Sequence, residues 1–126
     1  MAEYKILLVD DEEELVTTMV ERLEFRGLAA AAATSGADAL SQLRRERFDV
    51  VVIDLKMPGM DGLSLRDLIA VEFPGILVLM ATGHGSDAAS AAALPEGGEE
   101  VLLKPFSIEV LIDLIERKRR GGGGAP

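Results

Sequence analysis

The chain has 126 residues, of which 48% are hydrophobic, and it contains no cysteine. This length and apolar content suit one globular domain rather than a disordered chain, and the lack of cysteine excludes disulfides, thiolate metal sites and cysteine nucleophiles. The formal net charge of −9 argues against direct binding to nucleic acid and suits binding of divalent cations.

Five short apolar segments are spaced along the chain like the strands of a parallel sheet. They are Ile6–Val9, Leu28–Ala33, Val50–Ile53, Ile76–Met80 and Val101–Leu103. All but the second are near-continuous apolar runs, which is typical of strands covered on both faces. The second segment, LAAAAA, has poor β propensity, so an edge position in the sheet suits it best.

Amphipathic patterns between the strands predict five helices. The first carries Leu15, Met19 and Leu23 at a spacing of four residues. Gly27 follows it, and glycine commonly ends helices. Ser107 is placed to cap the last helix. The apolar positions of the other four helices are Leu40 and Leu43, then Leu65, Leu68 and Ile69, then Ala88–Leu94, and finally Ile108, Leu111, Ile112 and Ile115.

Alternating strands and helices predict right-handed crossovers and a three-layer α/β fold. We assign residues 1–120 to this domain and residues 121–126, GGGGAP, to a Gly-rich flexible tail or linker. The basic run Arg117–Arg120 lies just before that tail. We interpret it as cations at a helix C-terminus, where the helix dipole favours them, rather than as a nucleic-acid site.

Polar side chains follow the predicted strands at their carboxyl ends. These residues are Asp10, Asp11, Asp54, Thr82 and Lys104. The carboxyl ends of parallel strands meet at one edge of a sheet, so we expect these side chains to converge. Strands lie about 4.8 Å apart, so Asp10, Asp11 and Asp54 can share one Mg²⁺ if the first and third strands are neighbours. The adjacent acids Glu12–Glu14 are assigned to the start of a helix.

Four motifs occur in order along the chain: LLVDDE, VVIDLKMPGMDGL, MATGHG and LLKPF. Together, over Tyr4–Arg120, they resemble the receiver domain of two-component response regulators. The resemblance implies a flavodoxin-like, doubly wound α/β fold, with a five-stranded parallel sheet in the order 2-1-3-4-5 and five helices. It also implies a phosphoacceptor signalling module of a phosphorelay.

The resemblance assigns roles to the converging residues. Asp54 would accept a phosphoryl group from the phosphohistidine of a histidine kinase. Asp11 and Asp54 would bind Mg²⁺ directly, the carbonyl of Lys56 would complete the protein ligands, and Asp10 would act through water. Thr82 would bind phosphoryl oxygens.

Lys104 would also bind phosphoryl oxygens, and the Lys104–Pro105 bond is typically cis in the family. One position departs from the family pattern, because Val101 stands where an aromatic residue usually precedes the lysine by three positions. This departure bears on how the phosphorylated state is read out, and leaves the phosphorylation chemistry intact.

The expected partners are a sensor histidine kinase or phosphotransfer protein and an unknown output domain or partner. We expect no direct contact with nucleic acid or membrane, and a weak homodimer is left open. Because no signal peptide or apolar run of about 20 residues is present, a cytoplasmic location is expected. The domain would not be an enzyme beyond catalysing its own phosphorylation and dephosphorylation.

Two alternatives stay open. A haloacid-dehalogenase-type phosphatase also uses a strand-end aspartate and Mg²⁺, but it expects an Asp-x-Asp spacing, and here Asp10 and Asp11 are adjacent. The second alternative is a receiver-like interaction module that is never phosphorylated. The presence of all five polar residues, Asp10, Asp11, Asp54, Thr82 and Lys104, argues against it.

Overall fold

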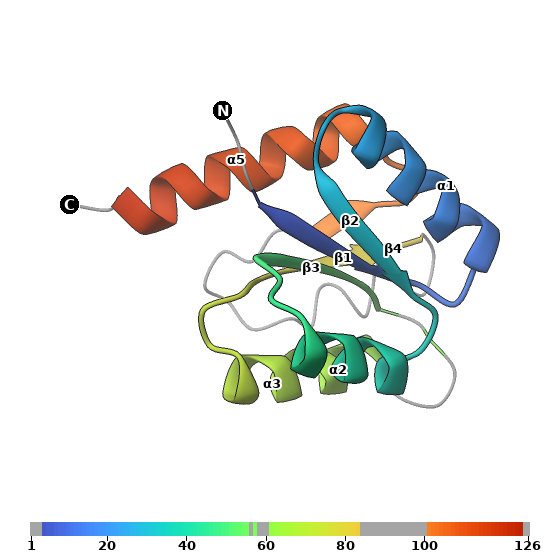
Figure 1. Cartoon of the computed structure of the whole chain (residues 1–126), viewed down its shortest axis with the longest axis vertical. Helices are drawn as coiled ribbons and strands as arrows, with labels where there is room; N and C mark the ends of the chain where they lie inside the picture. The colour runs from blue at the N-terminus through green and yellow to red at the C-terminus, as the bar shows by residue number, and fades with distance from the viewer. Residues whose placement is uncertain (1–3, 56, 58–60, 84–100, 125–126) are drawn as a thin grey trace.

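The computed structural model describes residues 4–55, 57, 61–83 and 101–124. In chain order its elements are β1 (Lys5–Val9), α1 (Glu13–Phe25), β2 (Ala29–Ala33), α2 (Gly36–Arg45), β3 (Val50–Asp54), α3 (Gly62–Glu72), β4 (Leu77–Thr82), β5 (Val101–Leu103) and α5 (Ile108–Gly124). The five strands are parallel and form one sheet in the order β2-β1-β3-β4-β5 (Figure 1). The predicted fold and strand order are therefore confirmed. The helix predicted at Ala88–Leu94 lies outside the described residues.

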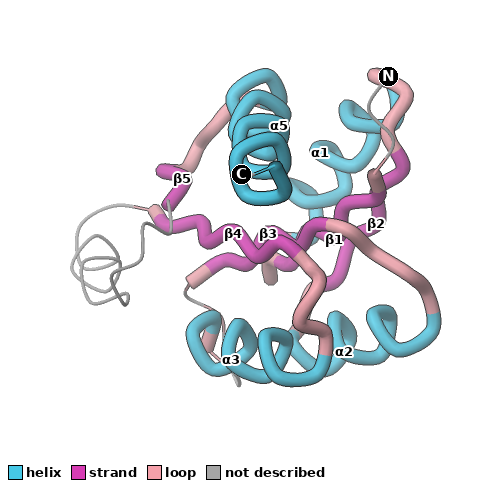
Figure 2. The backbone as a smooth tube through the Cα atoms, turned by 90° about the vertical axis from the view of Figure 1, so that its left-hand side faces the viewer, coloured by secondary structure: helices cyan, strands magenta, loops and turns pink. Residues whose placement is uncertain are grey.

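The sheet is the middle of three layers. Figure 2 shows α1 and α5 on one face and α2 and α3 on the other. Successive side chains of a strand point to opposite faces, so Ile6 and Leu8 of β1 pack with the first pair of helices. Leu7 and Val9 pack with the second pair. Burial on both faces explains why the central strands are uninterrupted apolar runs.

The alanine strand β2 lies at an edge of the sheet, as its weak β propensity suggested, and pairs only with β1. Helix α1 ends just before it. Gly27 has φ = 87°, a left-handed conformation that costs glycine little. The N–H of Gly27 donates to the carbonyl of Glu24, and the N–H of Leu28 donates to that of Leu23. The predicted helix stop at Gly27 is confirmed.

The prediction for the end of the chain is wrong, and one apolar position of α3 is exposed. Helix α5 continues through the four glycines to Gly124, where the sequence indicated the start of a flexible tail. Each glycine costs a helix about 1 kcal/mol relative to alanine, but extending a formed helix adds one hydrogen bond per residue. On α3, Leu68 is 44% exposed, because Leu65 and Ile69 take the positions that face the sheet. Among the described residues, no helix has both the length and the apolar character needed to cross a membrane.

Candidate functional site

Three carboxylates meet at the carboxyl edge of the sheet. Val9 of β1 is paired with Ile53 of β3, so Asp10 and Asp54, the next residues, emerge side by side. Asp10, Asp11 and Asp54 each offer one oxygen, and these oxygens lie within 4.8 Å of one another. Asp10 and Asp54 are buried, 8% and 6% exposed, whereas Asp11 is exposed. The predicted convergence of the three acids is confirmed.

The donor set of this cluster fits a hard divalent cation. Mg²⁺ prefers oxygen ligands, keeps several waters and is usually held by only a few carboxylates. Asp10, Asp11 and Asp54 would supply only part of the coordination sphere of such a cation, and water would complete it. Lys56, the expected carbonyl ligand, lies outside the described residues.

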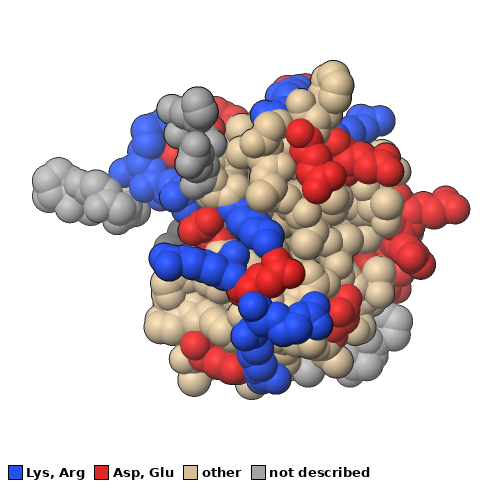
Figure 3. Space-filling view, in the orientation of Figure 1, with Lys and Arg blue, Asp and Glu red and all other residues tan. Residues whose placement is uncertain are grey.

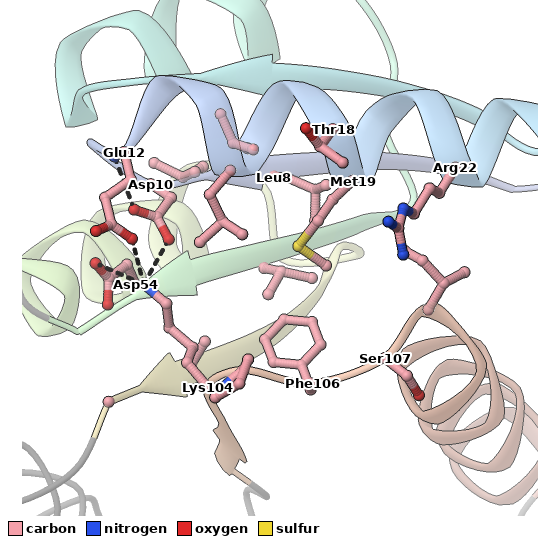
Figure 4. Close-up of a pocket in the computed structure, with 18 residues that line it drawn as sticks. Leu8, Asp10, Glu12, Thr18, Met19, Arg22, Asp54, Lys104, Phe106 and Ser107 are labelled. Carbon is pink, nitrogen blue, oxygen red and sulfur yellow. Dashed lines mark hydrogen bonds and ion pairs between the residues drawn. The ribbon is translucent and has the colours of Figure 1, made fainter.

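The ammonium group of Lys104 lies among Asp10, Asp54 and Glu12, as Figure 4 shows. Its Nζ donates a hydrogen bond to Asp10 Oδ2 at 2.7 Å and lies 3.6 Å from Asp54 Oδ2 and 3.7 Å from Glu12 Oε1. Burial of the ammonium works to lower its pKa. The hydrogen bond to Asp10 and the nearby negative charges outweigh that effect and raise the pKa of Lys104. The group is therefore a permanent cation at neutral pH.

Local hydrogen bonds hold Asp10 in place. Its Oδ1 accepts from the backbone N–H of Glu12 at 2.9 Å, and its own N–H donates to the carbonyl of Ala33 at 3.0 Å. One carboxylate oxygen thus organises the start of α1 while the other binds Lys104. Glu12 was predicted only as part of a helix start, and its approach to Lys104 was missed. The contact joins residues 92 positions apart, so no local pattern reveals it.

Thr82 is the last residue of β4 and is fully buried. Its neighbour Ala81 is paired with Asp54 of β3. The backbone carbonyl of Thr82 accepts a hydrogen bond from the N–H of Lys104 at 2.7 Å. Its hydroxyl Oγ1 has no hydrogen-bond partner among the residues that the structure describes. A buried polar group of this kind is uncommon and marks a place where an acceptor oxygen is favourable.

The segment that carries Lys104 has one feature expected from the resemblance and one that departs from it. The Lys104–Pro105 peptide bond is cis. Val101 of β5 is paired with Met80 of β4 and packs, partly buried, on the α2–α3 side of the sheet. A short β-branched side chain therefore occupies this position.

Helix α3 begins in direct contact with the end of β3. A Cβ atom on Gly62 would lie 2.5 Å from the carbonyl oxygen of Asp54 and 2.8 Å from Cα of Leu55. The N–H of Gly62 donates to the carbonyl of Leu55, and Asp61 caps the helix by accepting from the N–H of Ser64. Gly62 is thus required by close approach to the backbone of Asp54.

A pocket of about 510 Å³ adjoins the acids and was not foreseen from the sequence. It lies between α1 and the connection from β5 to α5 (Figure 4). Leu15, Met19 and Arg22 line it from α1, and Phe106 and Ile108 line it from the other side. The helical spacing of the three α1 residues was visible in the sequence, but the opposite wall depends on tertiary packing.

Comparison with known proteins gives consistent relatives. The family model for the response regulator receiver domain matches residues 6–116. The chain is 37% identical to the response regulator protein FleR of Pseudomonas aeruginosa over 117 residues, which are 93% of this chain and 25% of FleR. A solved CheY-like receiver domain from Methanospirillum hungatei is 26% identical with a TM-score of 0.84, over 99% of this chain and 100% of that one. The beryllofluoride-activated NtrC4 receiver domain dimer is 34% identical with a TM-score of 0.76, over 90% and 93%.

The chain belongs to the response regulator receiver domain family, and so to two-component signalling. The resemblance noted in its four motifs is confirmed. The chain spans about a quarter of the length of FleR and of the transport regulator DctD of Rhizobium meliloti.

Proposed function

We propose that Asp54 accepts a phosphoryl group from the phosphohistidine of a sensor histidine kinase or phosphotransfer protein, in a reaction that requires Mg²⁺. The observation that carries this proposal is the meeting of three carboxylates and the Lys104 ammonium at one edge of the sheet. Phosphoryl transfer depends mostly on positioning and charge stabilisation, and this edge provides both.

The metal would be held by Asp11 and Asp54 directly, by the carbonyl of Lys56, and by Asp10 through water. Once bound, Mg²⁺ would neutralise negative charge shared by the phosphoryl group and the carboxylates. The cluster geometry supports this assignment, since its three carboxylate oxygens lie within 4.8 Å.

The nucleophile would be a carboxylate oxygen of Asp54, which attacks phosphorus as the bond from phosphorus to the imidazole nitrogen of the donor breaks. The ammonium of Lys104, which lies 2.7 Å from Asp10, would attract the transferred phosphoryl oxygens. The unpartnered hydroxyl of Thr82 would donate to one of them. Asp10 would keep Lys104 in position through the hydrogen bond that already exists.

The domain would relay its phosphorylation state to an output domain or partner, in the cytoplasm and without itself contacting nucleic acid. Its only catalysis would be on its own phosphorylation and dephosphorylation. The structurally similar NtrC4 receiver domain is a dimer when activated by beryllofluoride, and a weak homodimer of this chain is proposed by analogy. The acids Asp10 and Asp11 are adjacent, which disfavours the haloacid-dehalogenase alternative. The buried, unpartnered hydroxyl of Thr82, at the end of the strand next to that of Asp54, disfavours a receiver that is never phosphorylated.

Intact-mass measurement with acetyl phosphate and Mg²⁺ tests the proposal. Wild type should gain one phosphoryl group that alkaline treatment removes, and Asp54→Ala should gain none. Lys104→Ala should still bind Mg²⁺ but respond weakly to phosphorylation. An adduct at normal yield in Asp54→Ala would place the nucleophile elsewhere. Multiple turnover would favour a phosphatase, and an unmodified wild type would favour the interaction module.

A further inference from the structure

The pocket beside the acids has the size and composition of a small-molecule site. Its volume of about 510 Å³ falls within the range of roughly 300–1,000 Å³ typical of ligand pockets. Leu15 and Met19 of α1 face Phe106 and Ile108 across it. In Figure 4 the thioether of Met19 points toward the Phe106 ring, so the middle of the pocket is apolar.

The two ends of the pocket differ in charge. At one end Lys104 is surrounded by Asp10, Asp54 and Glu12, so that end is negative overall. At the other end Figure 4 shows the guanidinium of Arg22, near the start of α5. Among the described residues this guanidinium has no hydrogen-bond or ion-pair partner, whereas Arg26, one turn further on, is paired with Glu109.

We propose that this pocket binds a small amphipathic carboxylate, with its apolar body between Met19 and Phe106 and its carboxylate paired with Arg22. The charge at the two ends sets the orientation, because the acids repel an anion from their end and Arg22 attracts it. An arginine also offers a planar pair of donors that matches a carboxylate.

The length of the ligand follows from the spacing along α1. Leu15 and Arg22 are seven residues apart, which is roughly 10 Å along a helix. A medium-chain fatty acid such as decanoate spans that distance while keeping its carboxylate at Arg22. The proposed ligand lies along α1, beside the acids that line the other end of the same pocket. Its binding does not depend on whether Asp54 is phosphorylated.

Decanoate titration of the isotope-labelled chain, followed by NMR in metal-free buffer, tests this proposal. We expect saturable shifts centred on Leu15, Met19 and Phe106, and roughly tenfold weaker binding to Arg22→Gln, since a charge-assisted pair is lost. Arg45→Gln, on α2 across the sheet, is the charge-matched control and should bind like wild type. The neutral analogue 1-decanol should bind wild type as weakly as decanoate binds Arg22→Gln.

A second variant, Met19→Trp, should fill the pocket and abolish binding while circular dichroism confirms that it folds. If it fails to fold, Arg22→Gln alone decides, since that side chain is exposed. The proposal is overturned if decanoate gives no saturable shifts at the pocket, if Arg22→Gln binds as tightly as wild type, or if decylammonium binds better than decanoate.

Discussion

Replacing Asp54 by asparagine removes one negative charge from the acid cluster and leaves its shape almost unchanged. Asp10 and Asp11 each lie within 4.8 Å of Asp54, and Lys104 lies 3.6 Å away. At an effective dielectric constant of about 40, between surface and bulk values, the two acids repel Asp54 by about 3.5 kcal/mol and Lys104 attracts it by about 2.3 kcal/mol. Repulsion exceeds attraction, so Asp54→Asn should stabilise the metal-free protein by about 1 kcal/mol.

Urea denaturation followed by far-ultraviolet circular dichroism measures this difference, first with a chelator and then with Mg²⁺. Mg²⁺ at about ten times its Kd should stabilise wild type by about 1.4 kcal/mol, because it binds only the folded state. Asp54→Asn has lost one proposed ligand, so it should gain less. The difference in unfolding free energy between Asp54→Asn and wild type should therefore shrink, or change sign, as Mg²⁺ is added.

Asp67→Asn is the matched control. Asp67 lies on α3 outside the cluster, and its side chain is 69% exposed, so its replacement should leave both the urea midpoint and the Mg²⁺ effect nearly unchanged. Equal stabilisation of wild type and Asp54→Asn by Mg²⁺ would refute the shared metal site. A metal-free Asp54→Asn that is less stable than wild type would refute the balance of charges described here.

Three further predictions concern other parts of the domain. Gly62→Ala places a methyl group against the backbone of Asp54. Thermal denaturation should show a loss of about 1–3 kcal/mol of stability, and Mg²⁺ should bind more weakly. Wild-type stability and Mg²⁺ affinity would contradict the close contact. The pKa of Tyr4, the sole tyrosine, is raised above 10.0 by burial and by Glu116, so absorbance at 295 nm should titrate above pH 10 in folded protein and lower in Glu116→Gln. The stability from neutral Tyr4 is present below pH 10 and should be lost as pH rises through its folded pKa. With beryllofluoride, amide shifts at Val101 should stay smaller than those at Asp54, because its stiff χ1 permits little movement; comparable shifts would contradict this.

Much of the site was predictable because a parallel sheet brings strand ends together. Once β1 and β3 are neighbours, Asp10 and Asp54 must lie close, whatever the loops do. The composition of the alanine strand β2 predicted its edge position, whereas the full strand order was implied by the resemblance to receiver domains. The local sequence predicts which residues lie at the carboxyl edge of the sheet because their positions depend only on the hydrophobic pattern of each strand and on where the strand ends.

Contacts between distant segments were not predictable in the same way. The approach of Glu12 to Lys104 depends on how the start of α1 lies relative to the residues after β5, and the pocket depends on how Met19 faces Phe106. The extent of α5 was wrongly predicted for another reason. The low helix propensity of glycine is only a weak preference, and a helix that has already formed can continue through the four glycines.

The buried hydroxyl of Thr82 would link the stability of this domain to the size of its response to phosphorylation. With no partner among the described residues, it leaves the unphosphorylated fold short by about 1–3 kcal/mol of the stability that a satisfied group would give. If Thr82 binds a phosphoryl oxygen as proposed, phosphorylation would recover that free energy, and a ligand shifts a protein's states only through such a difference. Thr82→Val keeps the shape without the hydroxyl, so it should resist urea better and respond less to beryllofluoride. The domain would thus remain responsive by remaining slightly less stable than its own architecture allows.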